Sequence, residues 1–216
     1  MKKKKVNESF SKYFVIIACI STALILISNV LSVKLFSISK LVLPSSAILF
    51  PLTYIIGDII AEVYGYKKSK FVIILGFICN AIMVILFSIT IELPAADTWH
   101  NQEAFKLILG TTPRMFIASL SAYLIGSLSN AFMMNYIKKL TKGKYLWIRT
   151  IGSTIIGEAL DTIIFVLIAF VGTPSQCILL TMLICQFTWK VSYEIISTPI
   201  TYLIINKYKK LEKITN

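Results

Sequence analysis

The chain has 216 residues, of which 56% are hydrophobic, and its mean hydropathy is +0.79. Soluble domains contain about 45–50% apolar residues, so the composition indicates an integral membrane protein and leaves no room for a separate soluble domain. A net charge of +12 would suit a nucleic-acid-binding protein. The basic residues, however, lie in short runs between apolar blocks, which is the pattern of cytoplasmic loops in membrane proteins. We therefore expect the lipid bilayer as a partner and no nucleic acid.

Apolar stretches long enough to cross a bilayer, about 20 residues each, occupy approximately residues 13–33, 42–62, 71–91, 114–136, 147–171 and 180–205. The second stretch contains Pro44 and Pro51 together with two acids, so we expect it to be kinked or broken. The predicted fold is an all-α integral membrane protein, with one domain of six transmembrane helices over residues 1–216.

The positions of lysine and arginine predict the orientation of these spans. With the N-terminus inside, the basic runs at 2–5, 67–70, 138–149 and 207–213 all fall on the cytoplasmic side, and only Lys34, Lys40, Lys106 and Arg114 fall outside. We therefore predict a multi-pass protein of the cell membrane with both termini in the cytoplasm. The run at 2–5 resembles a signal-peptide start, but no small-residue cleavage site follows, so we expect a retained first helix.

The longest connection, about residues 92–113, would lie outside the membrane. Its segment NQEAFKLIL at 101–109 predicts a short interfacial helix with Phe105 and Leu109 facing lipid. His100, the one histidine of the sequence, lies in the same connection, where we expect a surface residue rather than a catalyst.

Two halves of the sequence carry a similar tetrapeptide. IIGD at 55–58 recurs as IIGE at 155–158, each in the middle span of a three-span half and each followed by a second acid, Glu62 or Asp161. Three spans per half would make the halves point in opposite directions. The pattern is compatible with two inverted three-helix repeats, an arrangement that places substrate near the bilayer midplane.

Charged residues interrupt the apolar spans. Each costs about 2.5–3.5 kcal/mol at the centre of a transmembrane helix, so Glu158, Asp161 and Lys190 indicate a polar site inside the membrane. Polar and aromatic residues share one helical face in three spans: Phe50, Tyr54, Asp58 and Glu62; Thr154, Glu158, Asp161, Thr162 and Phe165; Gln186, Lys190, Tyr193, Glu194 and Ser197. Three such faces can line one cavity.

A purely structural interpretation of these charges is also open. Lys190 and Glu194 are four residues apart and can pair with each other along one helix. Asp58 and Glu62 lie near the cytoplasmic end of their span, where they can bind Lys67 or reach water.

Other residues point to helix packing. Ala118, Ala122, Gly126 and Asn130 form a stripe of small residues that favours close packing of the fourth span. We expect Gly157 to loosen the fifth.

Neither an enzyme active site nor a cofactor site is indicated. Cys19, Cys79, Cys177 and Cys185 lack the spacing of metal ligands, so we expect reduced cysteines and no bound metal. No Walker A sequence is present, so the chain itself is not expected to hydrolyse ATP.

The residue types of the predicted cavity define a class of ligand. Four acids (Asp58, Glu158, Asp161 and Glu194) outnumber Lys190, and carboxylates favour a ligand rich in N–H donors or positive charge. Rings for stacking come from Phe50, Tyr54, Phe165, Trp189 and Tyr193. A flat, amino-bearing heterocycle fits this description.

Several motifs resemble those of the YhhQ-type queuosine precursor transporters, the VUT family. They are Asn29, FPLTYIIGDIIAEVYGY at 50–66, PRMFIASLSAYLIGS at 113–127, LWIRTIGSTIIGEALDTIIF at 146–165, and the run from Lys190 through Glu194 to Pro199. The resemblance implies a transporter, not an enzyme, that imports 7-deazaguanines (preQ0, preQ1 or queuine) salvaged for queuosine in tRNA. The chain departs from some relatives, which have Asp at the position of Asn130 and a neutral residue at that of Glu158.

On this resemblance we expect alternating access. Glu158 and Asp161 would hold the purine-like edge, and Lys190 would contact the carbonyl oxygen. Arg114 would orient an outer gate, with Asp58 and Glu62 as its inner counterpart. The predicted substrate-binding residues are Asn29, Phe50, Tyr54, Asp58, Glu62, Arg114, Glu158, Asp161, Phe165, Gln186, Trp189, Lys190, Tyr193 and Glu194.

Two other classes of protein stay open at this point. The substrate-binding subunit of an energy-coupling-factor importer has a similar size and number of spans, and would need a partner ATPase. An intramembrane enzyme has few candidate residues for nucleophilic or metal chemistry. A homodimer is compatible with either transporter interpretation.

Overall fold

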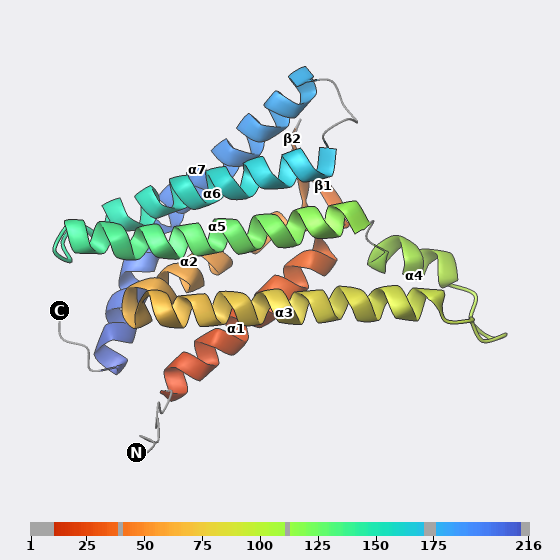
Figure 1. The fold of residues 1–216 in the computed structure, drawn as a ribbon, viewed down its shortest axis with the longest axis horizontal. Coiled ribbons are helices and arrows are strands. Elements are labelled where there is room, and N and C mark those ends of the chain that lie inside the picture. Colours follow the sequence, from red (N-terminus) through yellow and green to blue (C-terminus); the bar gives the residue numbers. More distant parts are fainter. Residues whose placement is uncertain (1–10, 39–40, 111–112, 171–175, 213–216) are drawn as a thin grey trace, which may run out of the picture.

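The structure is a computed structural model that describes residues 11–38, 41–110, 113–170 and 176–212. Long helices dominate it: α1 (Lys12–Leu31), α3 (Gly65–Glu92), α5 (Pro113–Leu140), α6 (Leu146–Phe170) and α7 (Gln176–Leu211). Figure 1 shows α3, α5 and α6 running side by side, with α1 and α7 crossing them. The helical expectation is confirmed, and five of the predicted spans correspond to these five helices.

The second predicted span is broken, as expected from its prolines. Its residues form strand β2 (Leu41–Pro44), paired antiparallel with β1 (Leu35–Ile38), then the 3₁₀ turn η1 (Ser45–Ile48), the helix α2 (Phe50–Ile59) and the π-helical segment η2 (Ile60–Tyr64). Proline lacks a backbone N–H and is tolerated only in the first turn of a helix, which is where Pro51 lies. The hairpin was not anticipated by the all-α prediction.

Four stretches of the described residues are long and apolar enough to cross a membrane: Lys12–Leu31, Leu52–Glu92, Phe116–Leu140 and Leu146–Ile168. The second of them contains Gly65, whose φ of 79° lies in the left-handed region. At this glycine the chain reverses direction between α2 and α3 (Figure 1). Leu52–Glu92 therefore comprises two of the predicted spans, and the six-span topology stays a prediction.

The surface and the interior have the polarity expected of a membrane protein. Large apolar side chains point outward along the helices, with Ile196 and Leu203 each 72% exposed. Hydroxyl groups lie inside, because Thr150, Ser153 and Thr201 are fully buried. An apolar exterior of this kind is stable against lipid rather than water.

The short helix predicted at 101–109 is present as α4 (Gln102–Leu109). Phe105 packs edge-on against Trp99, with ring centroids 6.3 Å apart, and Leu109 lines the internal cavity described below. The prediction that both side chains face lipid was therefore wrong for Leu109. The more exposed apolar side chains of α4 are Leu107 and Ile108.

The close packing predicted for the small-residue stripe is confirmed. A Cβ atom on Gly126 of α5 would lie 2.7 Å from the Cβ of Asp161, and one on Gly157 of α6 would lie 2.7 Å from the Cβ of Asn130. Gly157 thus allows α5 and α6 to touch backbone to backbone, a role that the sequence prediction did not give it. This contact places Asp161 against Gly126 and Asn130 against Gly157, and both Asp161 and Asn130 line the cavity described below.

Candidate functional site

A cavity of about 970 Å³ lies among the helices, large enough for a small organic molecule. Its lining includes residues of α1, α2, α3, α5, α6 and α7, and at one end it reaches Ser32 and Val33, which follow α1, and Leu109 of α4. At the other end it stops near Gly57 and Ile60. Of the predicted substrate-binding residues, those on this lining are Asn29, Tyr54, Glu158, Asp161, Phe165, Trp189 and Lys190.

The charged centre of the cavity is a triad of Lys190, Glu158 and Asp161. The Lys190 ammonium lies 2.9 Å from Glu158 Oε2 and also donates a hydrogen bond to Asp161 Oδ2. The two acids are one turn apart on α6, so they share the face that meets α7. Their side chains keep some exposure to the cavity, 16% for Glu158 and 23% for Asp161. The alternative pairing of Lys190 with Glu194 along α7 was wrong, because Lys190 pairs across to α6.

Aromatic rings surround the triad. Tyr54, Phe165 and Trp189 line the cavity, and Tyr193 packs edge-on against Trp189, with ring centroids 5.2 Å apart. The side chains of Phe50 and Gln186 lie outside the described residues. The cavity therefore offers at least three ring faces beside two carboxylates and one ammonium group.

Two polar atoms of the lining are available to a ligand. Asn130 Oδ1 and Trp189 Nε1 are buried and have no hydrogen-bond partner in the structure. A buried acceptor or donor without a hydrogen bond destabilises a protein by about 1–3 kcal/mol. Each of these two atoms is therefore a strong candidate to bind a polar group that enters the cavity. Asn130 was regarded as a packing residue from the sequence. The sequence feature that could have identified it as a site residue is a polar amide within an apolar span.

Nearer the α4 end of the cavity, Asn29 of α1 donates a hydrogen bond of 2.7 Å to Asn80 Oδ1 of α3. Both residues line the cavity, and Asn80 is only 3% exposed. Sequence reasoning missed Asn80, although an amide in the middle of a long apolar run marks an interior position.

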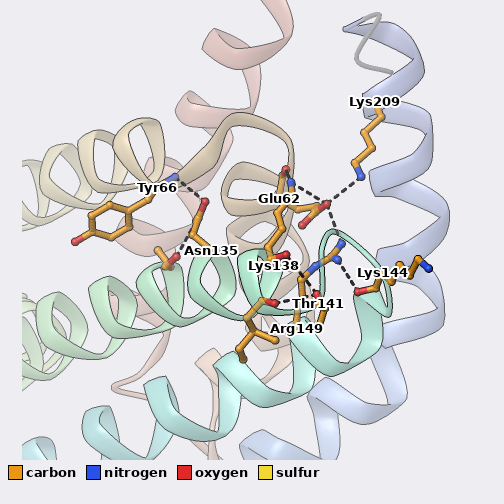
Figure 2. Close-up of polar contacts among 10 residues, drawn as sticks. Glu62, Tyr66, Asn135, Lys138, Thr141, Lys144, Arg149 and Lys209 are labelled. Carbon is orange, nitrogen blue, oxygen red and sulfur yellow. Dashed lines mark hydrogen bonds and ion pairs between the residues drawn. The ribbon is translucent and has the colours of Figure 1, made fainter. Parts of the chain in front are cut away.

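Glu62 does not line the cavity. Its Oε1 atom lies 2.9 Å from Arg149 of α6, 3.1 Å from Lys138 of α5 and 2.9 Å from Lys209 of α7. Figure 2 shows the three cations converging on this carboxylate, with Arg149 also donating to the Lys144 carbonyl oxygen. We call these four residues the Glu62 cluster. The expectation that Glu62 binds Lys67 or reaches water was wrong, since its side chain is fully buried and bound by residues of three other helices.

Arg149 was counted from the sequence as a loop residue. It is instead 1% exposed, at the start of α6, because the buried carboxylate of Glu62 compensates its charge. Arg114, predicted at an outer gate, lies on the exposed surface and donates a hydrogen bond of 2.6 Å from Nε to the Ile168 carbonyl oxygen of α6. That bond joins the first turn of α5 to the last turns of α6.

Asp58 and Glu194 lie between the cavity and the Glu62 cluster. Each is 1% exposed, and neither is part of the cavity lining. Asp58 follows Tyr54 by one turn on α2, and Glu194 follows Lys190 by one turn on α7, so the two acids lie at the end of the cavity that Gly57 and Ile60 line. The expectation that Asp58 reaches water was therefore wrong.

Metal binding finds no support in the described part of the chain. Residues 11–38, 41–110, 113–170 and 176–212 contain no group of three or more His, Cys, Asp and Glu side chains placed to hold a metal ion.

Comparison with known proteins identifies a family. The family model described as "Putative vitamin uptake transporter" matches residues 44–204. A protein of Bacillus subtilis (strain 168), named "Probable queuosine precursor transporter", is 24% identical over 176 residues, which cover 81% of this chain and 77% of the relative. No solved structure matches the chain significantly.

Proposed function

Because the chain belongs to the vitamin uptake transporter family, a family of transporters and not of enzymes, we propose that it imports 7-deazaguanine precursors of queuosine. PreQ0, preQ1 and queuine are the candidate substrates. The name of the Bacillus relative supports this substrate class. The observation that carries the proposal is the pair of acids on α6, held by Lys190 beside three aromatic rings in an internal cavity.

The chemistry of the triad suits a guanine-like edge. Such an edge presents an N1–H and an exocyclic amino group, two adjacent donors that one carboxylate accepts together. Lys190 would then turn to the ring carbonyl oxygen, which the carboxylates cannot bind. The face of Trp189 or Phe165 would stack on the flat heterocycle. Asn130 Oδ1 and Trp189 Nε1 would bind the remaining polar groups of the ligand.

Alternating access is the mechanism we propose for the movement of this ligand. With both termini in the cytoplasm, the Glu62 cluster lies on the inner side of the membrane, and Ser32, Val33 and Leu109 lie toward the outer side. Supporting this, the ends of the described chain, the α2–α3 turn and the α5–α6 connection all lie at one end of the molecule (Figure 1). The cluster ties η2, α5, α6 and α7 together below the cavity. Opening toward the cytoplasm would separate these four ion-paired residues.

Uptake of labelled precursor by cells that lack queuosine precursor synthesis tests this function. We expect Asp161→Asn to lower uptake at limiting substrate by about tenfold to a hundredfold, since a hydrogen bond to a charged group contributes about 1.5–3 kcal/mol. Asp97→Asn, which removes a carboxylate from the exposed connection before α4, is the matched control and should transport like wild type. Wild-type uptake by Asp161→Asn would remove this residue from the site.

If the chain is instead the substrate-binding subunit of an energy-coupling-factor importer, a different result is expected with purified protein in vesicles. Exchange of preQ0 across vesicles that contain only this chain would show that no ATPase partner is needed. Transport that appears only after an ATPase module is added would favour the substrate-binding subunit of such an importer.

A further inference from the structure

Two buried carboxyl groups from helices distant in the sequence meet beneath the cavity. Asp58 of α2 and Glu194 of α7 lie where these two helices pack together, close enough for each charge to act on the other, and both side chains are 1% exposed. On α2, Asp58 lies between Gly57 and Ile60, which line the end of the cavity, and on α7 Glu194 lies one turn beyond Lys190. Asp58 is also one turn from Glu62. The pair therefore lies in the partition between the binding site and the cytoplasmic cluster.

None of the four carboxylate oxygens of this pair receives a hydrogen bond within the described residues. This distinguishes the pair from the other buried acids, because Lys190 binds Glu158 and Asp161, and three cations bind Glu62. The penalty for burying an ionised carboxylate without a partner is several kcal/mol. Two such charges in contact would add mutual repulsion. A proton on one carboxyl removes one charge and supplies the missing donor to the other.

Further charged and polar groups surround the pair. The titratable or charged groups that act on the pair are Glu62 from η2, Glu158 from α6 and Tyr54 from α2, and Asn130 of α5 is the neutral polar neighbour. Within the described residues, the nearby cations are already held by other acids: Lys190 by the triad, and Arg149, Lys138 and Lys209 by Glu62. The pair therefore lies among further negative charges.

Both acids precede irregular helical segments. The π-helical segment Ile60–Tyr64 begins two residues after Asp58, and such segments are frequent at functional sites. Glu194 precedes Pro199, which breaks the hydrogen-bond ladder of α7, and the Thr198 hydroxyl donates a bond of 2.7 Å to the Glu194 carbonyl oxygen. A change of charge at the pair would therefore act close to an irregular segment in each of the two chain regions.

We propose that Asp58 and Glu194 form a proton-binding site that couples substrate import to the proton gradient. The inference rests on the proposed function for its substrate. In the outward-open state, one carboxylate oxygen takes a proton from the outer solution through the cavity, and the O–H group donates to the other carboxylate. When the Glu62 cluster separates, water from the cytoplasm reaches the pair and the O–H bond breaks, releasing the proton inside. One proton enters with each substrate molecule, so the transporter is a symporter.

The experiment uses the full-length protein in proteoliposomes, with the membrane potential clamped at zero and labelled preQ0 as the probe. PreQ0 is uncharged, so a one-unit pH gradient, alkaline inside, should drive its accumulation up to about tenfold in wild type. The variant Asp58→Asn/Glu194→Gln should lose this accumulation when it is expressed relative to the variant's own rate of preQ0 exchange at zero gradient. Glu103→Gln, an exposed carboxyl on α4, is the matched control and should accumulate like wild type.

A substrate-free measurement separates this inference from the proposed function. Infrared spectra of purified wild type at neutral pH should show the carbonyl stretch of a protonated carboxylic acid, shifted in D₂O and lost in the Asp58→Asn/Glu194→Gln variant. If no variant or wild type exchanges preQ0, the proposed substrate is wrong, and the infrared band still decides the proton site. Absence of the band from wild type, or accumulation by the double variant equal to wild type, overturns the proposal.

Discussion

The Glu62 cluster predicts a large loss of stability from an isosteric change. Glu62→Gln keeps the shape of the side chain and removes the charge that compensates Arg149, whose side chain is 2% exposed. Arg149 Nε already lacks a hydrogen-bond partner in the structure. Removing one member of a buried ion pair costs about 3–5 kcal/mol, so we expect the free energy of unfolding to fall by that amount. Lys138→Met should cost only about 1 kcal/mol, because this lysine is 36% exposed and solvent screens its charge.

The interaction energy between Glu62 and Arg149 is measured with a double-mutant cycle in mixed detergent micelles, under conditions where unfolding is reversible. Arg149→Met removes the buried cation, so Glu62→Gln should cost at least about 2 kcal/mol less in that background than in wild type. A Glu62→Gln variant within about 0.5 kcal/mol of wild type, or a coupling energy near zero, would refute the assignment of Glu62 and Arg149 as a buried, mutually dependent pair.

Two further contacts give predictions that thermal unfolding of the purified protein can check. Gly126→Ala should lower stability by about 1–3 kcal/mol, because its Cβ would lie 2.7 Å from Asp161 on the neighbouring helix. Gly57→Ala, whose Cβ meets nothing within 4 Å, should be stabilising by about 0.5–1 kcal/mol. Equal changes in stability from Gly126→Ala and Gly57→Ala would contradict the packing argument. Asn29→Ala should cost about 1–3 kcal/mol, since it leaves the Asn80 acceptor buried without a donor. Adding Asn80→Leu should recover part of that loss, and full additivity of the two changes would show that the amides do not interact.

The sequence predicts the helices and the meeting of α6 with α7 better than it predicts the partners of individual charges. Spacing alone places Glu158 and Asp161 on one face of α6 and Lys190 on the polar face of α7. Because a charge in lipid is costly, both faces must turn toward the interior of the protein. Those rules act within a single helix. They cannot distinguish Glu194 from Glu158 as the partner of Lys190, since that choice depends on how far α7 is rotated against α6.

Arg149 illustrates a second kind of limit. Counting basic residues assigns Arg149 to a cytoplasmic loop and treats it as a solvated charge, but the side chain is buried. Its burial follows from Glu62, a residue 87 positions earlier, which no local pattern connects to it. Likewise, Gly157 looks like a helix-weakening residue in isolation. Its role as a contact point appears only when the backbone of α5 lies against it.

Two helices carry polar residues at all three levels of the molecule: the cavity, the acid pair and the Glu62 cluster. On α2 and η2 the sequence Tyr54, Asp58 and Glu62 advances one turn at a time from the cavity to the cluster, and α7 presents Lys190, Glu194 and Lys209 in the same order. Because α2 packs directly on α7, a rotation of one helix against the other would move the residues at the cavity, at the acid pair and at the Glu62 cluster together. On the proposed mechanism, such a rotation would link substrate at Lys190, a proton at the acid pair and the ion pairs of Glu62.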